Sequence, residues 1–229
     1  MKEFAADAEQ IRRRFAEVRE RVDAAALTAD RDPADVEILV ATKYLPVDGL
    51  GALRDAGISL IGENRAQALV EKHAQFGDQF VFDFIGRLQS RKTRLVLPLV
   101  RLIHSVESMS VVQEIEARAE SPVEVLLEVN VDEEDSKAGL VPDEIDAFLD
   151  QASAGEKVRF VGLMCMPALS LVPEQARPSF ALTRELADRL SDAWRGRYTF
   201  ARLSMGTSAD YEVAVQEGAT IVRVGSVLF

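Results

Sequence analysis

Eight short apolar runs recur along the 229-residue chain, and stretches with helical periodicity separate them. Apolar runs rich in β-branched residues are typical of strands buried on both faces, and their alternation with helices predicts parallel strands. Eight such units fit a closed (β/α)8 barrel, with an open doubly wound sheet as the alternative. The predicted strands are Val36–Thr42, Ile58–Ile61, Phe80–Ile85, Leu102–Val106, Val123–Val129, Val158–Cys165, Thr199–Leu203 and Thr220–Val224.

An additional helix is predicted before the first strand, because Phe4–Leu27 has apolar residues at helical spacing and many alanines. No linker or internal repeat interrupts the rhythm that follows, so residues 1–229 are expected to form a single domain. The helices predicted between the strands are Pro46–Ala56, Arg65–Phe76, Arg91–Val100, Met109–Glu120, Pro142–Ala154, Pro173–Trp194 and Ser208–Glu217.

The first predicted strand, VEILVATK, ends in Lys43, and Pro46 then suits the first turn of a helix. In a barrel of this type, functional side chains gather at the carboxyl ends of the strands. Lys43 is therefore either an amine made nucleophilic by desolvation, able to form a Schiff base, or a lysine that extends into solvent. The residues that follow the eight strands predict a polar, glycine-containing rim around an apolar interior.

The segment Leu203–Tyr211, LSMGTSADY, contains the end of a strand, a glycine, hydroxyl side chains and the start of a helix. Thr207 and Asp210 have the spacing of a capping box, with Asp in place of the usual Glu. This segment predicts at least a well-capped helix. Its amides and hydroxyls could also hold a phosphate at the helix N-terminus.

The segment Val222–Ser226, VRVGS, strengthens the phosphate interpretation. Gly225 and Ser226 end the last strand and can present further amides, and barrels frequently bind phosphate on the loops after strands seven and eight. Arg223 lies in an otherwise apolar strand, so its charge needs a partner, either a ligand or a salt bridge within the barrel.

The composition of the chain limits the kinds of molecule that it is expected to bind. The formal net charge of −11 argues against a non-specific binder of nucleic acid or of an acidic membrane. The single cysteine, Cys165, fits a reducing cytoplasm and excludes an internal disulfide. We expect no signal peptide, no membrane span and no metal site, because the sequence has no apolar leader, no apolar run of about 20 residues and no cluster with metal-ligand spacing.

Taken together, these motifs resemble the pyridoxal phosphate homeostasis protein family, whose barrel is similar to the N-terminal domain of alanine racemase. The matching segments are VATKYLP, IGENRAQ, FIGRLQSRK, IHSVES, VNVDEEDSKAGL, GLMCMPA, LSMGTSADYEVAVQEGAT and VRVGS. The resemblance implies that Lys43 forms the Schiff base with pyridoxal 5'-phosphate and that Arg223 faces the pyridine nitrogen. It implies that Asn64 flanks the cofactor and that the phosphate contacts Ser204, Gly206, Thr207, Ser208, Gly225 and Ser226.

Four positions depart from the family pattern. Asp83 and Arg91 replace a usual histidine and asparagine, which could alter the rim or a partner surface. Thr207 and Ser226 replace a common methionine and threonine but keep or add a hydroxyl, so phosphate binding should be preserved.

Three hypotheses for function follow. The first is a monomeric, non-enzymatic carrier that holds pyridoxal phosphate on Lys43 and buffers it or delivers it to apo enzymes. The second is an amino-acid racemase, which would need a second base. The tyrosines Tyr44, Tyr198 and Tyr211 are not clearly placed for this, and the chain is too short for the domain that supplies a tyrosine in alanine racemase. The third is a barrel that binds another phosphate.

Overall fold

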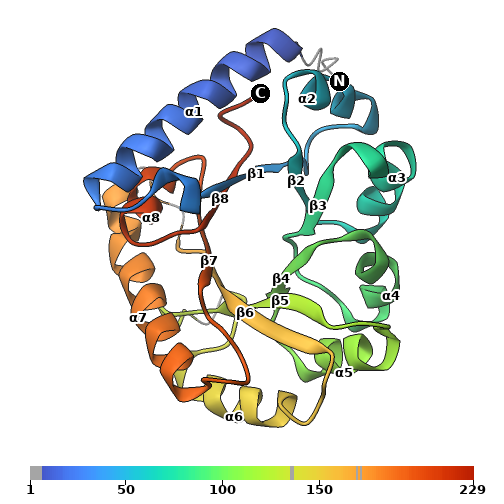
Figure 1. Cartoon of the computed structure of the whole chain (residues 1–229), viewed down its shortest axis with the longest axis vertical. Coiled ribbons are helices and arrows are strands. Elements are labelled where there is room, and N and C mark those ends of the chain that lie inside the picture. Colours follow the sequence, from blue (N-terminus) through green and yellow to red (C-terminus); the bar gives the residue numbers. More distant parts are fainter. Residues whose placement is uncertain (1–6, 135–136, 169, 171) are drawn as a thin grey trace.

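The protein forms a closed barrel of eight parallel strands in a computed structural model that describes residues 7–134, 137–168, 170 and 172–229. Helices surround the barrel, and the strands follow one another around it in chain order (Figure 1). The strands are β1 (Glu37–Ala41), β2 (Leu60–Glu63), β3 (Val81–Phe84), β4 (Leu102–Val106), β5 (Val123–Val129), β6 (Val158–Cys165), β7 (Arg202–Thr207) and β8 (Ile221–Val224). The predicted barrel is confirmed, and the open sheet is excluded because β1 pairs with β8.

The predicted N-terminal helix is present as α1 (Ala8–Thr28), while positions 4–6 of its predicted span lie outside the described residues. It buries Ile11, Val18 and Val22 and packs against α8 and α2. The other helices are α2 (Leu50–Asp55), α3 (Ala66–Phe76), α4 (Thr93–Val96), α5 (Met109–Arg118), α6 (Pro142–Ala152), α7 (Arg177–Ala193) and α8 (Tyr211–Gln216).

Two predicted elements differ clearly from the observed ones, and smaller boundary shifts occur elsewhere, such as β2 at Leu60–Glu63 rather than Ile58–Ile61. The seventh strand is Arg202–Thr207 rather than Thr199–Leu203, because Ser204 and Thr207 pair with β8 instead of forming a loop. The predicted helix Arg91–Val100 is broken into α4 and two 3-10 turns. Pro98 lies in the second of these turns, where its missing N–H cannot continue an α-helix.

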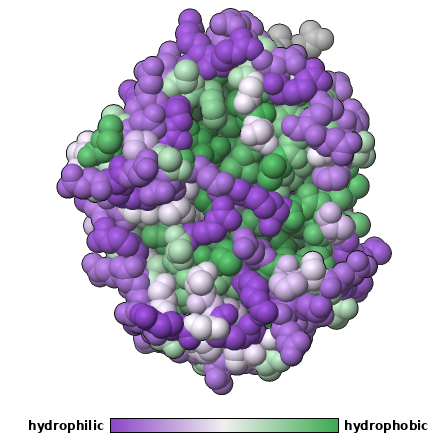
Figure 2. All heavy atoms as spheres, in the orientation of Figure 1, coloured by the Kyte–Doolittle hydropathy of each residue, from purple (hydrophilic) through white to green (hydrophobic). Residues whose placement is uncertain are grey.

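Side-chain alternation along the strands creates two separate apolar layers. The larger layer lies between the sheet and the helices and includes Val125 and Leu127 of β5. A smaller cluster comprises Leu39, Leu102, Leu126, Met164 and Ile221. Because alternate residues of a strand face opposite sides of the sheet, this second cluster fills the barrel interior. Figure 2 shows polar residues crossing the centre of one face of the molecule, between apolar ones.

Candidate functional site

A buried ion pair anchors the carboxyl end of β1. Lys72 of α3 is 2% exposed, and its ammonium contacts the carboxylate of Glu63 at the end of β2. The same ammonium donates to the carbonyl oxygen of Thr42 at 2.7 Å, and Glu63 accepts the backbone N–H of Asn64 at 2.8 Å. Because Thr42 directly precedes Lys43, this cluster fixes the backbone from which Lys43 extends.

Lys43 lies in the turn after β1 and is exposed. The Thr42 N–H still donates to Gly62 at 2.9 Å, and the Thr42 side chain lies on the helix side of the sheet with Lys72. Alternation therefore directs Lys43 to the other side, toward the barrel mouth. Its ammonium lies 5.0 Å from the ring centroid of Tyr44, and no carboxylate pairs with it among the described residues. Lys43 thus presents a solvent-accessible amine. Of the two alternatives predicted from the sequence, this is the lysine that extends into solvent.

The end of β8 lies beside the end of β1. Val224 is opposite Val40 in the strand pairing. A Cβ added to Gly225 would lie 3.2 Å from the carbonyl oxygen of Ala41, so the two backbones approach closely at this point. Lys43 is two residues beyond Ala41, or at most about 7 Å of extended chain. The loop after β8 and the turn that carries Lys43 are therefore neighbours at the barrel mouth.

Gly206 allows β7 to turn closely against α8. It has φ of +89°, and an added Cβ would lie 2.5 Å from the Cβ of Ala214. After this turn, one carboxylate oxygen of Asp210 accepts the Thr207 N–H at 2.6 Å and the Thr207 hydroxyl at 3.0 Å. The Asp210 carboxylate thus accepts the backbone hydrogen bond predicted for a capping box, but Asp210 rather than Thr207 is the N-cap, and α8 begins at Tyr211. The Asp210 carboxylate holds the turn closed.

A hydrogen bond joins the two loops that were predicted to hold phosphate. The Gly225 N–H donates to the Ser208 hydroxyl oxygen at 2.9 Å. Ser226 is exposed and has no hydrogen-bond partner among the described residues. The structure therefore brings Thr207, Ser208, Gly225 and Ser226 together at one end of β7 and β8.

Ser204 and Arg223 lie below these loops, inside the barrel. One terminal nitrogen of Arg223 donates to the Ser204 carbonyl and hydroxyl oxygens, both at 2.6 Å. The other donates to the carbonyl oxygen of Cys165 at 3.0 Å. Burial lowers the pKa of the Arg223 guanidinium. Among the described residues Arg223 forms no salt bridge, so backbone carbonyls and a hydroxyl hold this side chain in place.

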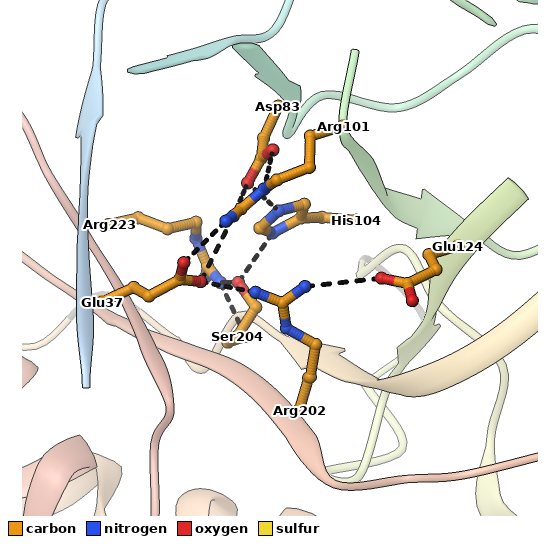
Figure 3. Close-up of polar contacts among 8 residues, drawn as sticks. All are labelled: Glu37, Asp83, Arg101, His104, Glu124, Arg202, Ser204 and Arg223. Carbon is orange, nitrogen blue, oxygen red and sulfur yellow. Dashed lines mark hydrogen bonds and ion pairs between the residues drawn. The ribbon is translucent and has the colours of Figure 1, made fainter. Parts of the chain in front are cut away.

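A chain of polar contacts continues from Ser204 through the barrel (Figure 3). His104 contacts the Ser204 hydroxyl at 2.9 Å through Nδ1 and the Asp83 carboxylate at 3.1 Å through Nε2. Arg101 then joins Asp83 at 2.7 Å to Glu37 at 2.6 Å. The prediction of a wholly apolar interior is therefore wrong, because this polar chain lies beside the interior apolar cluster. The suggestion that Asp83 alters the rim or a partner surface is also wrong, since its side chain is fully buried.

Electrostatics fix the direction of these hydrogen bonds. Burial lowers the pKa of His104, although the adjacent Asp83 carboxylate opposes this shift, and the lowered pKa favours the neutral imidazole. Burial alone would raise the pKa of Asp83, but hydrogen bonds from His104 and Arg101 lower it below its usual value. A neutral His104 must then donate from Nε2 to Asp83 and accept the Ser204 hydroxyl proton at Nδ1.

Asn64 lines a different cavity from Ser208. It lines a cavity of about 390 Å³ with Arg65, Arg87 and Lys92, whereas Ser208 lines a separate cavity of about 400 Å³ beside α8. Its side-chain oxygen is buried without a hydrogen-bond partner among the described residues. The sequence predicted that Asn64 lies at the mouth. It did not reveal the Glu63–Lys72 ion pair, whose carboxylate accepts the Asn64 N–H.

The described ranges contain neither a membrane-spanning helix nor a cluster of metal ligands. No helix there is both long and apolar enough to cross a bilayer. The histidine, cysteine, aspartate and glutamate side chains in the same ranges form no group of three or more that could hold a metal ion.

Comparison with known proteins places the chain in a family. Residues 47–229 match the family model described as the alanine racemase N-terminal domain. A pyridoxal phosphate homeostasis protein from Aquifex aeolicus is 36% identical over 220 residues, which cover 94% of this chain and 96% of the relative. The chain belongs to the pyridoxal phosphate homeostasis protein family. The family predicted from the sequence motifs is thus confirmed.

Two solved structures match this protein over the whole barrel. A protein of unknown function from Bifidobacterium adolescentis has a TM-score of 0.89 and 32% identity, with 100% of this chain and 98% of that chain covered. PipY from Synechococcus elongatus, determined with pyridoxal phosphate bound, has a TM-score of 0.82 and 30% identity, with 96% and 99% covered. The family model begins after Lys43, whereas the Aquifex relative and PipY match nearly the full chain.

Proposed function

We propose that this protein binds pyridoxal 5'-phosphate at the barrel mouth through Lys43, and buffers it or delivers it to apo enzymes that require it. The observation that carries the proposal is the unpaired amine of Lys43 beside the loop after β8, in a family whose relative PipY binds this molecule. The aldehyde of pyridoxal phosphate supplies a reversible covalent link to a primary amine, formed with loss of one water.

The residues at the mouth fit this ligand. Gly225 brings two strand ends together without a side chain between them, and Ser226 has a free hydroxyl and N–H at the adjoining loop. We assign the phosphate to the loops that contain Gly206, Thr207, Ser208, Gly225 and Ser226. The N–H and hydroxyl of Thr207 already donate to Asp210. We therefore expect Thr207 to shape the loop rather than to donate a strong hydrogen bond to the phosphate.

Ser204 and Arg223 are expected to lie beside the ring of the ligand rather than at its phosphate. Both lie inside the barrel below the mouth, and Ser204 is committed to Arg223 and His104. We assign Arg223 to the ring nitrogen of the ligand, where a guanidinium cannot accept a proton and disfavours protonation of a neighbouring nitrogen. An unprotonated ring is a poor electron sink, which favours a carrier over an enzyme.

The tyrosine positions also favour a carrier without racemase activity. Racemisation needs a second base at the substrate α-carbon. Tyr198 and Tyr211 are buried, and Tyr44 is 79% exposed beside Lys43. No tyrosine therefore faces Lys43 across the mouth from within the described residues.

Borohydride reduction followed by mass spectrometry tests the proposal. Protein incubated with pyridoxal phosphate should gain a pyridoxyl group on Lys43, and Lys43→Ala should lose both this adduct and the yellow absorbance. Lys157→Ala is the matched control, since Lys157 directly precedes β6 at the opposite end of the barrel from Lys43 and should be dispensable. An unmodified Lys43 would instead support a barrel for another phosphate. Transfer is tested by mixing loaded protein with an apo enzyme, and turnover of an amino-acid panel above free pyridoxal phosphate would contradict the carrier function.

A further inference from the structure

Glu128 is a buried carboxyl group inside the barrel that the site described above does not use. It is two residues beyond Leu126, which belongs to the interior apolar cluster, so alternation along β5 directs Glu128 into the barrel as well. Its side chain is only 8% exposed. Its Oε2 atom is buried and has no hydrogen-bond partner among the described residues.

An unpartnered buried carboxyl oxygen is costly and needs a reason. The side chain is not paired with a cation in a salt bridge within the described part of the chain. The charged groups that act on it are Glu107 after β4, Arg87 after β3 and Arg223 of β8. Burial and the negative charge of Glu107 raise the pKa of Glu128 to about 7, while the two arginines oppose the shift. Near neutral pH the carboxyl group can therefore either accept or donate a hydrogen bond.

Glu128 and Arg223 lie near enough to each other inside the barrel to interact electrostatically. Glu128 is opposite Met164 of β6, and Met164 is opposite Ser204 of β7. Ser204 in turn holds the guanidinium of Arg223 at 2.6 Å. A ring that enters the mouth and meets Arg223 would therefore lie near Glu128 as well.

We propose that Glu128 contacts the ring of bound pyridoxal phosphate and exchanges a hydrogen bond with the hydroxyl group of that ring. This inference rests on the proposed function. The ligand has four polar groups: the aldehyde is assigned to Lys43, the phosphate to the loops after β7 and β8, and the ring nitrogen to Arg223. The ring hydroxyl remains, and the unpartnered oxygen of Glu128 is the matching group in the barrel interior.

The test compares two ligands with three variants. The ligands are pyridoxal phosphate and its 3-deoxy analogue, which lacks the ring hydroxyl. The variants are Glu128→Gln, which keeps the shape, Glu128→Leu, which removes all hydrogen bonding, and Glu124→Gln. The last is a matched control, because Glu124 is on the same strand and contacts Arg202 at 3.6 Å near the other end of the barrel. Dissociation constants are measured by absorbance titration, and urea unfolding shows that each variant is folded.

Loss of the hydroxyl should weaken binding about tenfold more in the wild type and in Glu124→Gln than in Glu128→Leu, the size of one hydrogen bond. Glu128→Gln should give an intermediate ratio, because an amide can still bond the hydroxyl. The absorbance spectrum of bound ligand should also change with pH near 7 in the wild type and not in Glu128→Leu. Equal ratios in all four proteins would overturn the inference and leave the proposed function intact. Failure of the wild type to bind pyridoxal phosphate would overturn both.

Discussion

Replacement of Lys72 by methionine should destabilise the protein severely. Methionine fills a similar volume but removes the ammonium that contacts Glu63 and donates to the Thr42 carbonyl at 2.7 Å. The Glu63 carboxylate is fully buried, so Lys72→Met leaves an uncompensated charge in the core. Loss of one partner from a buried ion pair typically costs about 3–5 kcal/mol.

The assay is equilibrium urea unfolding at pH 7.5 without ligand. Lys72→Met should lower the free energy of unfolding by about 3–5 kcal/mol. Adding Glu63→Gln should recover most of this loss, because an amide removes the unpaired charge and can still accept the Asn64 N–H. Arg118→Met is the control: Arg118 is 46% exposed and pairs with Glu114 within α5. Loss of such an exposed pair should cost less than about 1 kcal/mol.

Two results would refute this reasoning about Lys72. A loss below about 1 kcal/mol for Lys72→Met would show that the pair does not carry the expected energy. A double variant no more stable than Lys72→Met would show that the unpaired Glu63 charge is not the cause.

Two other changes test separate features of the structure. Burial raises the pKa of Glu128 from 4.5 to about 7, so the stability that its protonated form contributes is present below about pH 4.5 and is lost as pH rises through 7. Glu128→Gln cannot lose a proton, so its unfolding free energy relative to wild type should rise by up to about 3 kcal/mol between pH 5 and pH 8, and a constant difference would contradict the shift. Gly206→Ala should cost at least about 2 kcal/mol in thermal or urea unfolding, from backbone strain plus a clash with Ala214. Gly57→Ala, at φ +85° with open space around it, should cost only about 1 kcal/mol, and equal losses would remove the role of the clash.

The sequence predicted the barrel because each strand is apolar on its helix-facing side, and that pattern is local. The predicted and observed strand limits agree for Leu102–Val106, Val123–Val129 and Val158–Cys165. The prediction failed for β7, because Ser204 and Thr207 are polar but face the interior or pair with β8. Polar residues at the end of a strand are predicted as a loop when the residues they pair with, far away in the sequence, are not known.

The candidate site was predictable at the ends of strands and not inside the barrel. The position of Lys43 follows from one strand and one turn. The chain from Arg223 to Asp83 depends on contacts between residues up to 100 positions apart, and no local pattern marks them. One signal was available for the buried pair: Lys72 is three residues after the buried Leu69, on the same face of α3.

The seam between β1 and β8 joins the start of the chain to its end. Lys43 is synthesised 183 residues before Ser226, the difference between 226 and 43. At about 5–20 residues per second, the amine leaves the ribosome roughly 10–40 s before the loop beside it exists. A molecule that needs both halves cannot be captured before the loop after β8 has been made, so its uptake requires that the ring of strands has closed.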